Sequence, residues 1–146
     1  GGKYSIVWRG IENPYGNIYK HIDGGKIVDH QMWVCQFPSG YDDKPSVDGK
    51  YEYPYMPLSY TNSVDNGYTK KMGFDKRFPH AKFPVEVGAG SSTYYSDYYY
   101  QNSGDRTIFV GGRWNAGFAA GPFYWYLTSS LGYTHFSRGA RLSYRP

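Results

Sequence analysis

The sequence predicts an α+β domain made of short strands and long ordered loops. Aromatic residues make up 21% of the 146 residues, with 18 Tyr, and Gly occurs 19 times. Tyr, Phe and Trp favour strands, whereas Gly and Pro interrupt regular elements throughout the chain. Only two short segments carry helix signals, and the clearest strand patterns come late. We therefore expect few helices and a sheet concentrated near the C-terminus.

In the first third of the chain we expect a strand, a short helix and a second strand. Residues 4–8 alternate between apolar and polar side chains, which is typical of a strand. Asn13 can cap a helix and Pro14 can occupy its first position, so a helix over residues 13–22 follows. Residues 27–37 form the next apolar run, in which Cys35 is expected to be a small buried side chain.

The remainder is predicted to be irregular until the last strands. Residues 38–50 form a loop, and residues 51–68 mix Pro and Tyr in a way that argues against a regular element. A short helix is possible at 68–72. The segment 78–100 leads from irregular chain into a strand, and further strands are expected at 106–112, 121–130 and 139–144. The first and last strands are expected to lie close together, because both need partners.

Composition restricts the possible functions. A single cysteine excludes an internal disulfide and a metal site built on several thiolates. No apolar run approaches the roughly 20 residues of a membrane helix, so no membrane insertion is expected. The net charge is +4, and all nine Lys lie between positions 3 and 82. Five late Arg among aromatic residues could bind single-stranded nucleic acid, but there is no basic run, so no nucleic-acid partner is expected.

The stretch NAGFAAGPFYWYLTSSLGYTHFSRGARL, residues 115–142, combines large aromatic side chains with Gly, Ala, Ser and Thr and contains no Asp, Glu or Lys. Such a stretch is either the core of a small domain or a surface that binds a ligand. Tyrosine offers a large contact area with few rotatable bonds and a polar tip, and it is common in binding surfaces.

Four segments carry a family resemblance. They are GIENPYGNIYKHIDG (10–24), STYYSDYYY (92–100), GGRWNAGFAAGPFYWYLTSS (111–130) and GARLSYRP (139–146). Together they resemble the C-terminal domains of phage and prokaryotic proteins that are targets of diversity-generating retroelements. The resemblance implies a C-type lectin-like fold, of the kind shared with formylglycine-generating enzymes, over a single domain, 1–146, with a variable region at about 111–142.

The resemblance divides the variable region into two classes of residue. The positions that match the fixed scaffold are Gly111, Gly112, Trp114, Gly121, Pro122, Phe123, Gly139, Ala140, Arg141 and Leu142. The interspersed positions, which would contact the ligand, are Ala116, Phe118, Ala119, Tyr126, Thr128, Ser129, Tyr133, His135, Phe136 and Ser137. We expect Trp114, Phe123 and Leu142 to be buried. Phe118, Tyr126, Tyr133, His135 and Phe136 should be accessible and form one patch.

The function expected is non-enzymatic ligand or receptor binding, without a cofactor or metal. The resemblance implies a host or target cell-surface protein or glycan as partner, and a location on a phage tail or a cell surface. The start without Met suggests a piece of a longer protein, and a homo-oligomer of that parent protein is considered as a further partner. The alternative is a glycan-binding module or a glycoside hydrolase acting on cell-surface polysaccharide.

Other candidates for chemistry have simpler explanations. The four His residues show no metal-ligand spacing. Asp42, Asp43 and Asp48 lack the alternation of an EF-hand loop, although lectin-like folds sometimes hold Ca²⁺. Cys35 alone does not match the catalytic cysteine pair of formylglycine-generating enzymes, and a shared fold does not transfer an activity.

Overall fold

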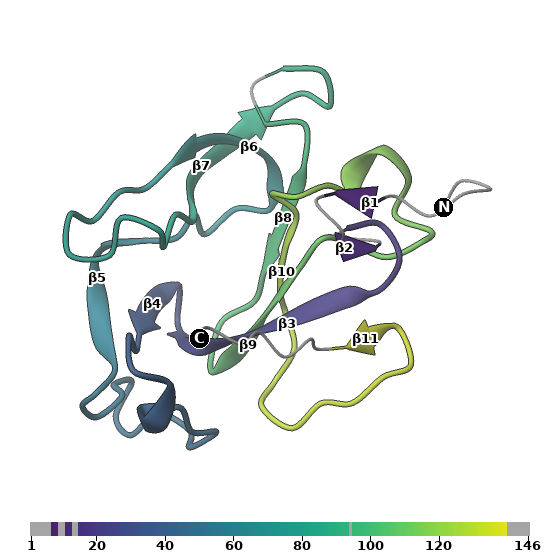
Figure 1. The fold of residues 1–146 in the computed structure, drawn as a ribbon. Helices are drawn as coiled ribbons and strands as arrows, with labels where there is room; N and C mark the ends of the chain where they lie inside the picture. Colours follow the sequence, from purple (N-terminus) through teal and green to yellow (C-terminus); the bar gives the residue numbers. More distant parts are fainter. Residues whose placement is uncertain (1–6, 9–10, 13–14, 94, 140–146) are drawn as a thin grey trace.

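The computed structural model describes residues 7–8, 11–12, 15–93 and 95–139. Figure 1 shows the strands gathered into a curled sheet, with a short two-stranded ribbon beside it. The helical pieces in the described residues are two single 3₁₀ turns. The elements are β1 (Val7–Trp8), β2 (Ile11–Glu12), β3 (Tyr19–Val28), β4 (Gln31–Val34), η1 (Pro38–Gly40), β5 (Met56–Thr61), β6 (Gly67–Met72), β7 (Pro84–Ala89), β8 (Tyr98–Gln101), β9 (Arg106–Val110), η2 (Gly117–Ala119), β10 (Trp125–Leu127) and β11 (Arg138–Gly139).

The strands do not cross the sheet in chain order. Their order is β5-β4-β3-β9-β10-β8-β6-β7, and β11 pairs with the beginning of β3. Most neighbours are antiparallel, but β10 runs parallel to β8 and β11 runs parallel to β3. The sheet is therefore mixed, and several of its pairings join segments that are far apart in the sequence.

The predicted α+β class, and with it the C-type lectin-like fold, is wrong, because the described residues contain no α-helix. The second half of the helix expected at 13–22 belongs to β3, which pairs with β9 and β4. Residues 68–72, the other expected helix, lie in β6 between β7 and β8. A helix this short is marginal without packing partners. Hydrogen bonds from neighbouring strands therefore decide the conformation of both segments.

The single strand expected at 27–37 is two strands joined by a tight turn. Val28 at the end of β3 pairs with Gln31 at the start of β4. Asp29 and His30 between them have positive φ values of 44° and 71°. Two-residue hairpins favour turns with positive φ at both central positions, and Asp and His adopt this region more readily than most residues. The turn contains no glycine, so no local sequence pattern indicated it.

The other strand predictions have mixed outcomes. β9 confirms the strand expected at 106–112, whereas β10 covers only three residues of the one expected at 121–130. β5 lies in the stretch expected to be irregular because of Pro57. It is the last strand on its side of the sheet order, where proline is tolerated. The terminal strands expected at 4–8 and 139–144, and their proximity, lie largely outside the described residues.

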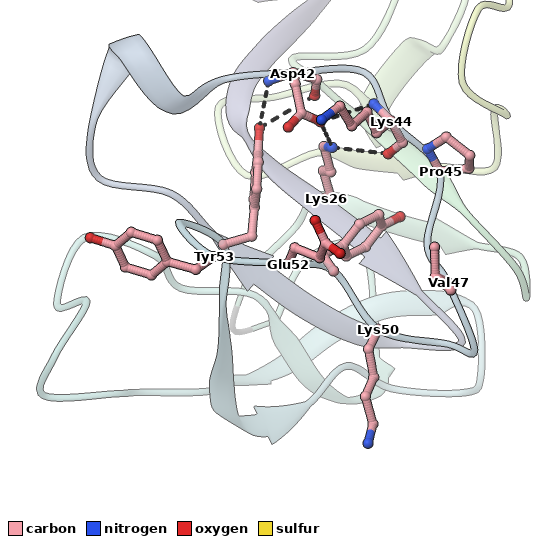
Figure 2. Close-up of a pocket in the computed structure, with 10 residues that line it drawn as sticks. Lys26, Asp42, Lys44, Pro45, Val47, Lys50, Glu52 and Tyr53 are labelled. Carbon is pink, nitrogen blue, oxygen red and sulfur yellow. Dashed lines mark hydrogen bonds and ion pairs between the residues drawn. The ribbon is translucent and has the colours of Figure 1, made fainter.

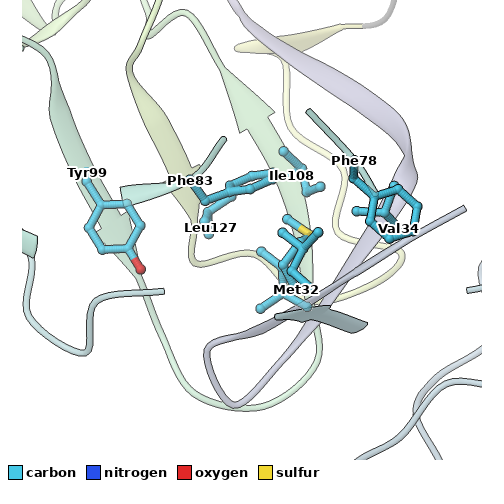
Figure 3. Packing of buried hydrophobic residues seen from close by; sticks show 9 residues of the cluster. Met32, Val34, Phe78, Phe83, Tyr99, Ile108 and Leu127 are labelled. Carbon is cyan, nitrogen blue, oxygen red and sulfur yellow. The ribbon is translucent and has the colours of Figure 1, made fainter. Parts of the chain in front are cut away.

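One face of the sheet carries the main hydrophobic core. Ile27, Met32 and Leu127 are completely buried there. Figure 3 shows Met32, Ile108 and Leu127 among the side chains that pack between the strands. Cys35 is buried in a second, smaller cluster, which confirms its predicted role as a small core residue.

We expect Leu127→Ala to lower the free energy of unfolding by about 2–5 kcal/mol, because it empties a fully buried site at the centre of the sheet. Leu131→Ala, in the half-buried loop after β10, is the matched control and should cost less than about 1 kcal/mol. Urea unfolding of both variants measures the difference. Equal losses would show that the core does not depend on β10.

Candidate ligand-binding surface

The face of the sheet opposite the main core is rich in tyrosine. Alternation along β8 places Tyr99 in the main core and Tyr98 and Tyr100 on the other face. In the same way, β10 sends Leu127 to the core and Tyr126 to the tyrosine face, where Tyr126 lies opposite Tyr100. The inner tyrosine cluster consists of buried Tyr19, Phe109 and Tyr124 and half-buried Tyr98, Tyr100 and Tyr126.

The rings of the inner tyrosine cluster hold each other in place. The ring centroids of Tyr19 and Tyr126 are 4.7 Å apart in a stacked arrangement, and those of Tyr98 and Tyr100 are 4.4 Å apart. The hydroxyl oxygens of Tyr19 and Tyr124 are 3.4 Å apart. Burial, together with this hydrogen bond, raises the pKa of Tyr124 above its usual value. The inner tyrosine cluster is thus uncharged and closely packed.

Arg138 in β11 connects the inner tyrosine cluster to the loop that precedes β11. Its guanidinium carbon lies 4.6 Å from the ring centroid of Phe109 and 4.2 Å from that of Tyr133. Tyr126 is a third aromatic neighbour, at 5.6 Å. The Nε and Nη1 atoms are buried without a hydrogen-bond partner. Aromatic faces therefore provide the main stabilisation of this cation, through cation–π attraction.

Three further rings extend from Arg138 toward solvent, and we call them the outer aromatic cluster: Tyr133, His135 and Phe136. Tyr133 is 51% exposed and Phe136 is 85% exposed. The centroid of His135 lies 6.4 Å from that of Tyr133 and 4.2 Å from that of Phe136. The backbone N–H of Ser137 donates to His135 Nδ1 at 3.2 Å, so the neutral imidazole carries its proton on Nε2.

The structure brings together four of the ten positions expected to contact a ligand. Tyr126, Tyr133, His135 and Phe136 form a continuous series of rings through Arg138. The others are less accessible or undescribed: Ser129 and Ser137 are buried, Ala116, Ala119 and Thr128 are half-buried, and the side chain of Phe118 lies outside the described residues. Tyr126 is itself half-buried, so the accessible part of the series is the outer aromatic cluster.

Two of the expected core residues are at the surface. Trp114 is 58% exposed and Phe123 is 48% exposed, so the prediction that they are buried is wrong. Tyr124 takes the buried position instead, in the inner tyrosine cluster. Phe123 lies in a turn that the Tyr124 N–H closes by donating to the Gly121 carbonyl at 3.1 Å, and Tyr124 at the end of this turn faces inward. Leu142, the third expected core residue, lies outside the described residues, as do Ala140 and Arg141.

Asp97 fixes the loop before β10, and sequence reasoning missed it. Its buried carboxylate accepts a 2.6 Å hydrogen bond from the backbone N–H of Phe123. A Cβ at Gly121 would overlap this carboxylate, so the scaffold glycine permits the close approach. Burial raises the pKa of Asp97, although the Phe123 hydrogen bond opposes the shift. A lone Asp within a tyrosine run was the only signal in the sequence.

A separate cavity of about 300 Å³ contains a buried lysine (Figure 2). Lys26 on β3 is 4% exposed, forms an ion pair with Asp42 and donates to the carbonyl of Lys44 at 2.9 Å. Its ammonium also lies 4.4 Å from the ring centroid of Tyr55 and 5.0 Å from that of Tyr51. The hydrogen bond from Lys26 lowers the pKa of Asp42. These contacts attach the loop after η1 to the sheet.

Asp42 was one of the three carboxylates considered for Ca²⁺. In the part of the chain that the structure describes, no group of three His, Cys, Asp or Glu side chains could hold a metal ion. Nor does any helix among the described residues have the length and apolar character needed to cross a membrane.

No protein-family model matches this chain, and no curated protein matches it either. The resemblance to retroelement-diversified proteins stays a prediction, and the function is inferred from the geometry of the surface.

We expect Asp97→Asn to change how stability depends on pH. Because the pKa of Asp97 is raised in the folded state, the folded chain binds this proton more tightly than the unfolded chain. The native free energy of unfolding should therefore fall as the pH rises from about 4 through the folded pKa. Asn still accepts the Phe123 N–H but does not titrate. The free energy of unfolding of the Asp97→Asn variant, relative to that of the native chain, should rise over this pH range and then level off.

Urea unfolding at a series of pH values measures this difference. Asp97→Ala is the control: it also lacks the titration, but it leaves the Phe123 N–H without an acceptor and should be less stable than Asp97→Asn by about 1–3 kcal/mol. A constant difference between Asp97→Asn and the native chain from pH 4 to neutrality would contradict the raised pKa.

Proposed function

We propose that this protein is a non-enzymatic ligand-binding protein, and that its outer aromatic cluster contacts the ligand. The observation that carries the proposal is the pair of strongly exposed rings, Tyr133 and Phe136, both of which neighbour the ring of His135. Contiguous exposed aromatic surface on a folded domain is typical of an interaction site. Tyrosine, phenylalanine and histidine together offer apolar faces and polar tips to a partner.

The packing of the outer aromatic cluster against Arg138 favours high affinity for a ligand. Arg138 packs against Tyr133 on one side and against Phe109 of the inner tyrosine cluster on the other. His135 is fixed through its hydrogen bond from the Ser137 backbone. Side chains that are already ordered lose little conformational entropy on binding, so more of the contact energy appears as affinity. The surface is an aromatic platform in the loop before β11, linked to the sheet through Arg138.

The ligand we propose is a protein or glycan on the surface of a host or target cell. An aromatic platform can bury apolar protein side chains or the C–H faces of sugar rings. The family resemblance implies a phage tail or a prokaryotic cell surface as the setting. Attachment through several copies of the chain in one particle would raise the overall affinity without any new contact.

We expect the double variant Tyr133→Ser, Phe136→Ser to lose ligand binding by about 30-fold or more, because aromatic anchors carry much of the energy of an interface. Its melting temperature should fall by about 3–6 °C, since both side chains are exposed but Tyr133 also supplies one of the cation–π contacts of Arg138. Binding is measured against a panel of bacterial surface proteins and immobilised glycans. Phe37→Ser, which removes another exposed aromatic ring, is the matched control and should bind normally.

The variant Tyr126→Ser distinguishes the role of the inner tyrosine cluster from that of the outer aromatic cluster. Because Tyr126 stacks on Tyr19 within the inner cluster, its loss should lower the free energy of unfolding by about 2 kcal/mol or more. Ligands that bind the outer double variant and the native chain equally well would refute the proposal. So would a double variant as unstable as Tyr126→Ser, since the rings would then belong to the core.

A further inference from the structure

A second surface feature lies beside β6, away from the residues of the outer aromatic cluster. It is an open cavity of about 450 Å³ whose lining includes Lys70, Lys71 and Lys82 together with the rings of Phe74 and Tyr95. Among the residues of the lining that the structure describes, lysine is the only charged type. The cavity therefore combines positive charge with aromatic surface.

Phe74 is the apolar contact surface of this cavity. Its side chain is 61% exposed, and the ammonium of Lys82 lies 6.0 Å from the centroid of its ring. Tyr95 meets Phe123 edge-on, with the ring centroids 5.4 Å apart, so this side of the cavity is held by a ring contact. A ligand can thus contact an apolar ring and a cation within a few ångströms.

Tyr60 holds both sides of this arrangement in place. Its ring packs so closely under Gly73 that a Cβ there would overlap it, which fixes the backbone just before the exposed phenylalanine. Its hydroxyl donates to the carbonyl of Ala81 at 2.8 Å and accepts from the N–H of Phe83 at 3.1 Å. These two residues flank Lys82. The backbone at the phenylalanine and at the lysine is therefore positioned by one half-buried side chain before any ligand binds.

An ion pair between β6 and β7 partly neutralises the charge of the cavity. Glu86 on the neighbouring strand pairs with Lys70 at 2.6 Å, and both Lys70 and Lys71 lower the pKa of Glu86. One carboxylate thus faces two lysines, and Lys82 adds a third cation to the lining. Charge complementarity favours an anionic ligand.

We propose that this cavity binds an acidic polysaccharide built from uronic acids, with one sugar ring on Phe74 and its carboxylate directed toward Lys82. A uronic acid carries its carboxylate directly on the sugar ring, so a flat C–H face and a negative charge lie a few ångströms apart. This matches the spacing of the phenylalanine ring and the lysine ammonium. The proposal does not rest on the function assigned to the outer aromatic cluster, because the two sites share no residue.

Single-stranded nucleic acid is the competing ligand, since it also combines rings with negative charge. In a nucleotide, however, the sugar separates the stacking base from the phosphate. Binding sites for single strands also use successive aromatic platforms, whereas Phe74 is the one strongly exposed ring among the described residues of this lining. The uronic-acid chain is therefore the better fit.

The test is calorimetric titration of the intact chain with a galacturonic acid hexasaccharide, with neutral maltohexaose and a six-nucleotide oligothymidylate as comparison ligands. We expect the acidic hexasaccharide to bind at least about tenfold more tightly than either. Phe74→Ala should weaken this binding by about tenfold, and Lys82→Gln by about threefold to fivefold. Lys50→Gln, which makes the same change in net charge at the Lys26 cavity, should have less than about a twofold effect.

Binding of the acidic hexasaccharide that is unaffected by both Phe74→Ala and Lys82→Gln would overturn the proposal, as would equal weakening by Lys50→Gln. Tighter binding of the oligothymidylate would assign the cavity to nucleic acid instead, and absence of binding up to millimolar concentration would remove the site altogether. The double variant Tyr133→Ser, Phe136→Ser should bind the acidic hexasaccharide normally. Failure at one site is thereby distinguished from failure at the other.

Discussion

The short strand β10 joins the two halves of the sheet. On one side it pairs antiparallel with β9, which leads to β3, β4 and β5, and on the other it pairs parallel with β8, which leads to β6 and β7. Its Leu127 is completely buried in the main core, whereas its Tyr126 stacks on Tyr19 on the opposite face. Three residues thus hold together the sheet, the core and the inner tyrosine cluster.

Alternation along the strands gives the sheet two chemically different faces. The core face buries aliphatic and phenylalanine side chains together with Tyr99, while the other face packs tyrosines whose hydroxyl groups still need partners. Burial raises the pKa of Tyr100 and Tyr124, so these rings stay neutral. A neutral aromatic face can hold the guanidinium of Arg138 by cation–π contact. The outer aromatic cluster extends from this cation, so its order depends on the packing beneath it.

The two proposed sites differ in how they would recognise a ligand. The outer aromatic cluster presents rings without lysine, so its binding should depend only mildly on salt. The cavity beside β6 presents lysines around Phe74, so its affinity should fall as salt screens them. A third feature, the cavity at Lys26, has its cation already held by Asp42 and two tyrosine rings. It fixes a loop to the sheet and is a structural contact.

Local sequence determined the properties that need only near neighbours: the strand at β9, the burial of Cys35, and the alternation of tyrosines along β8. Tertiary structure decided the other features, because each of them depends on partner residues that are distant in the sequence. Segments with helix signals became β3 and β6 when other strands offered hydrogen bonds. Likewise, Tyr124 rather than Phe123 became buried, since its hydroxyl meets that of Tyr19, 105 residues away. No local pattern encodes such a contact, and the position of the aromatic surface follows from it.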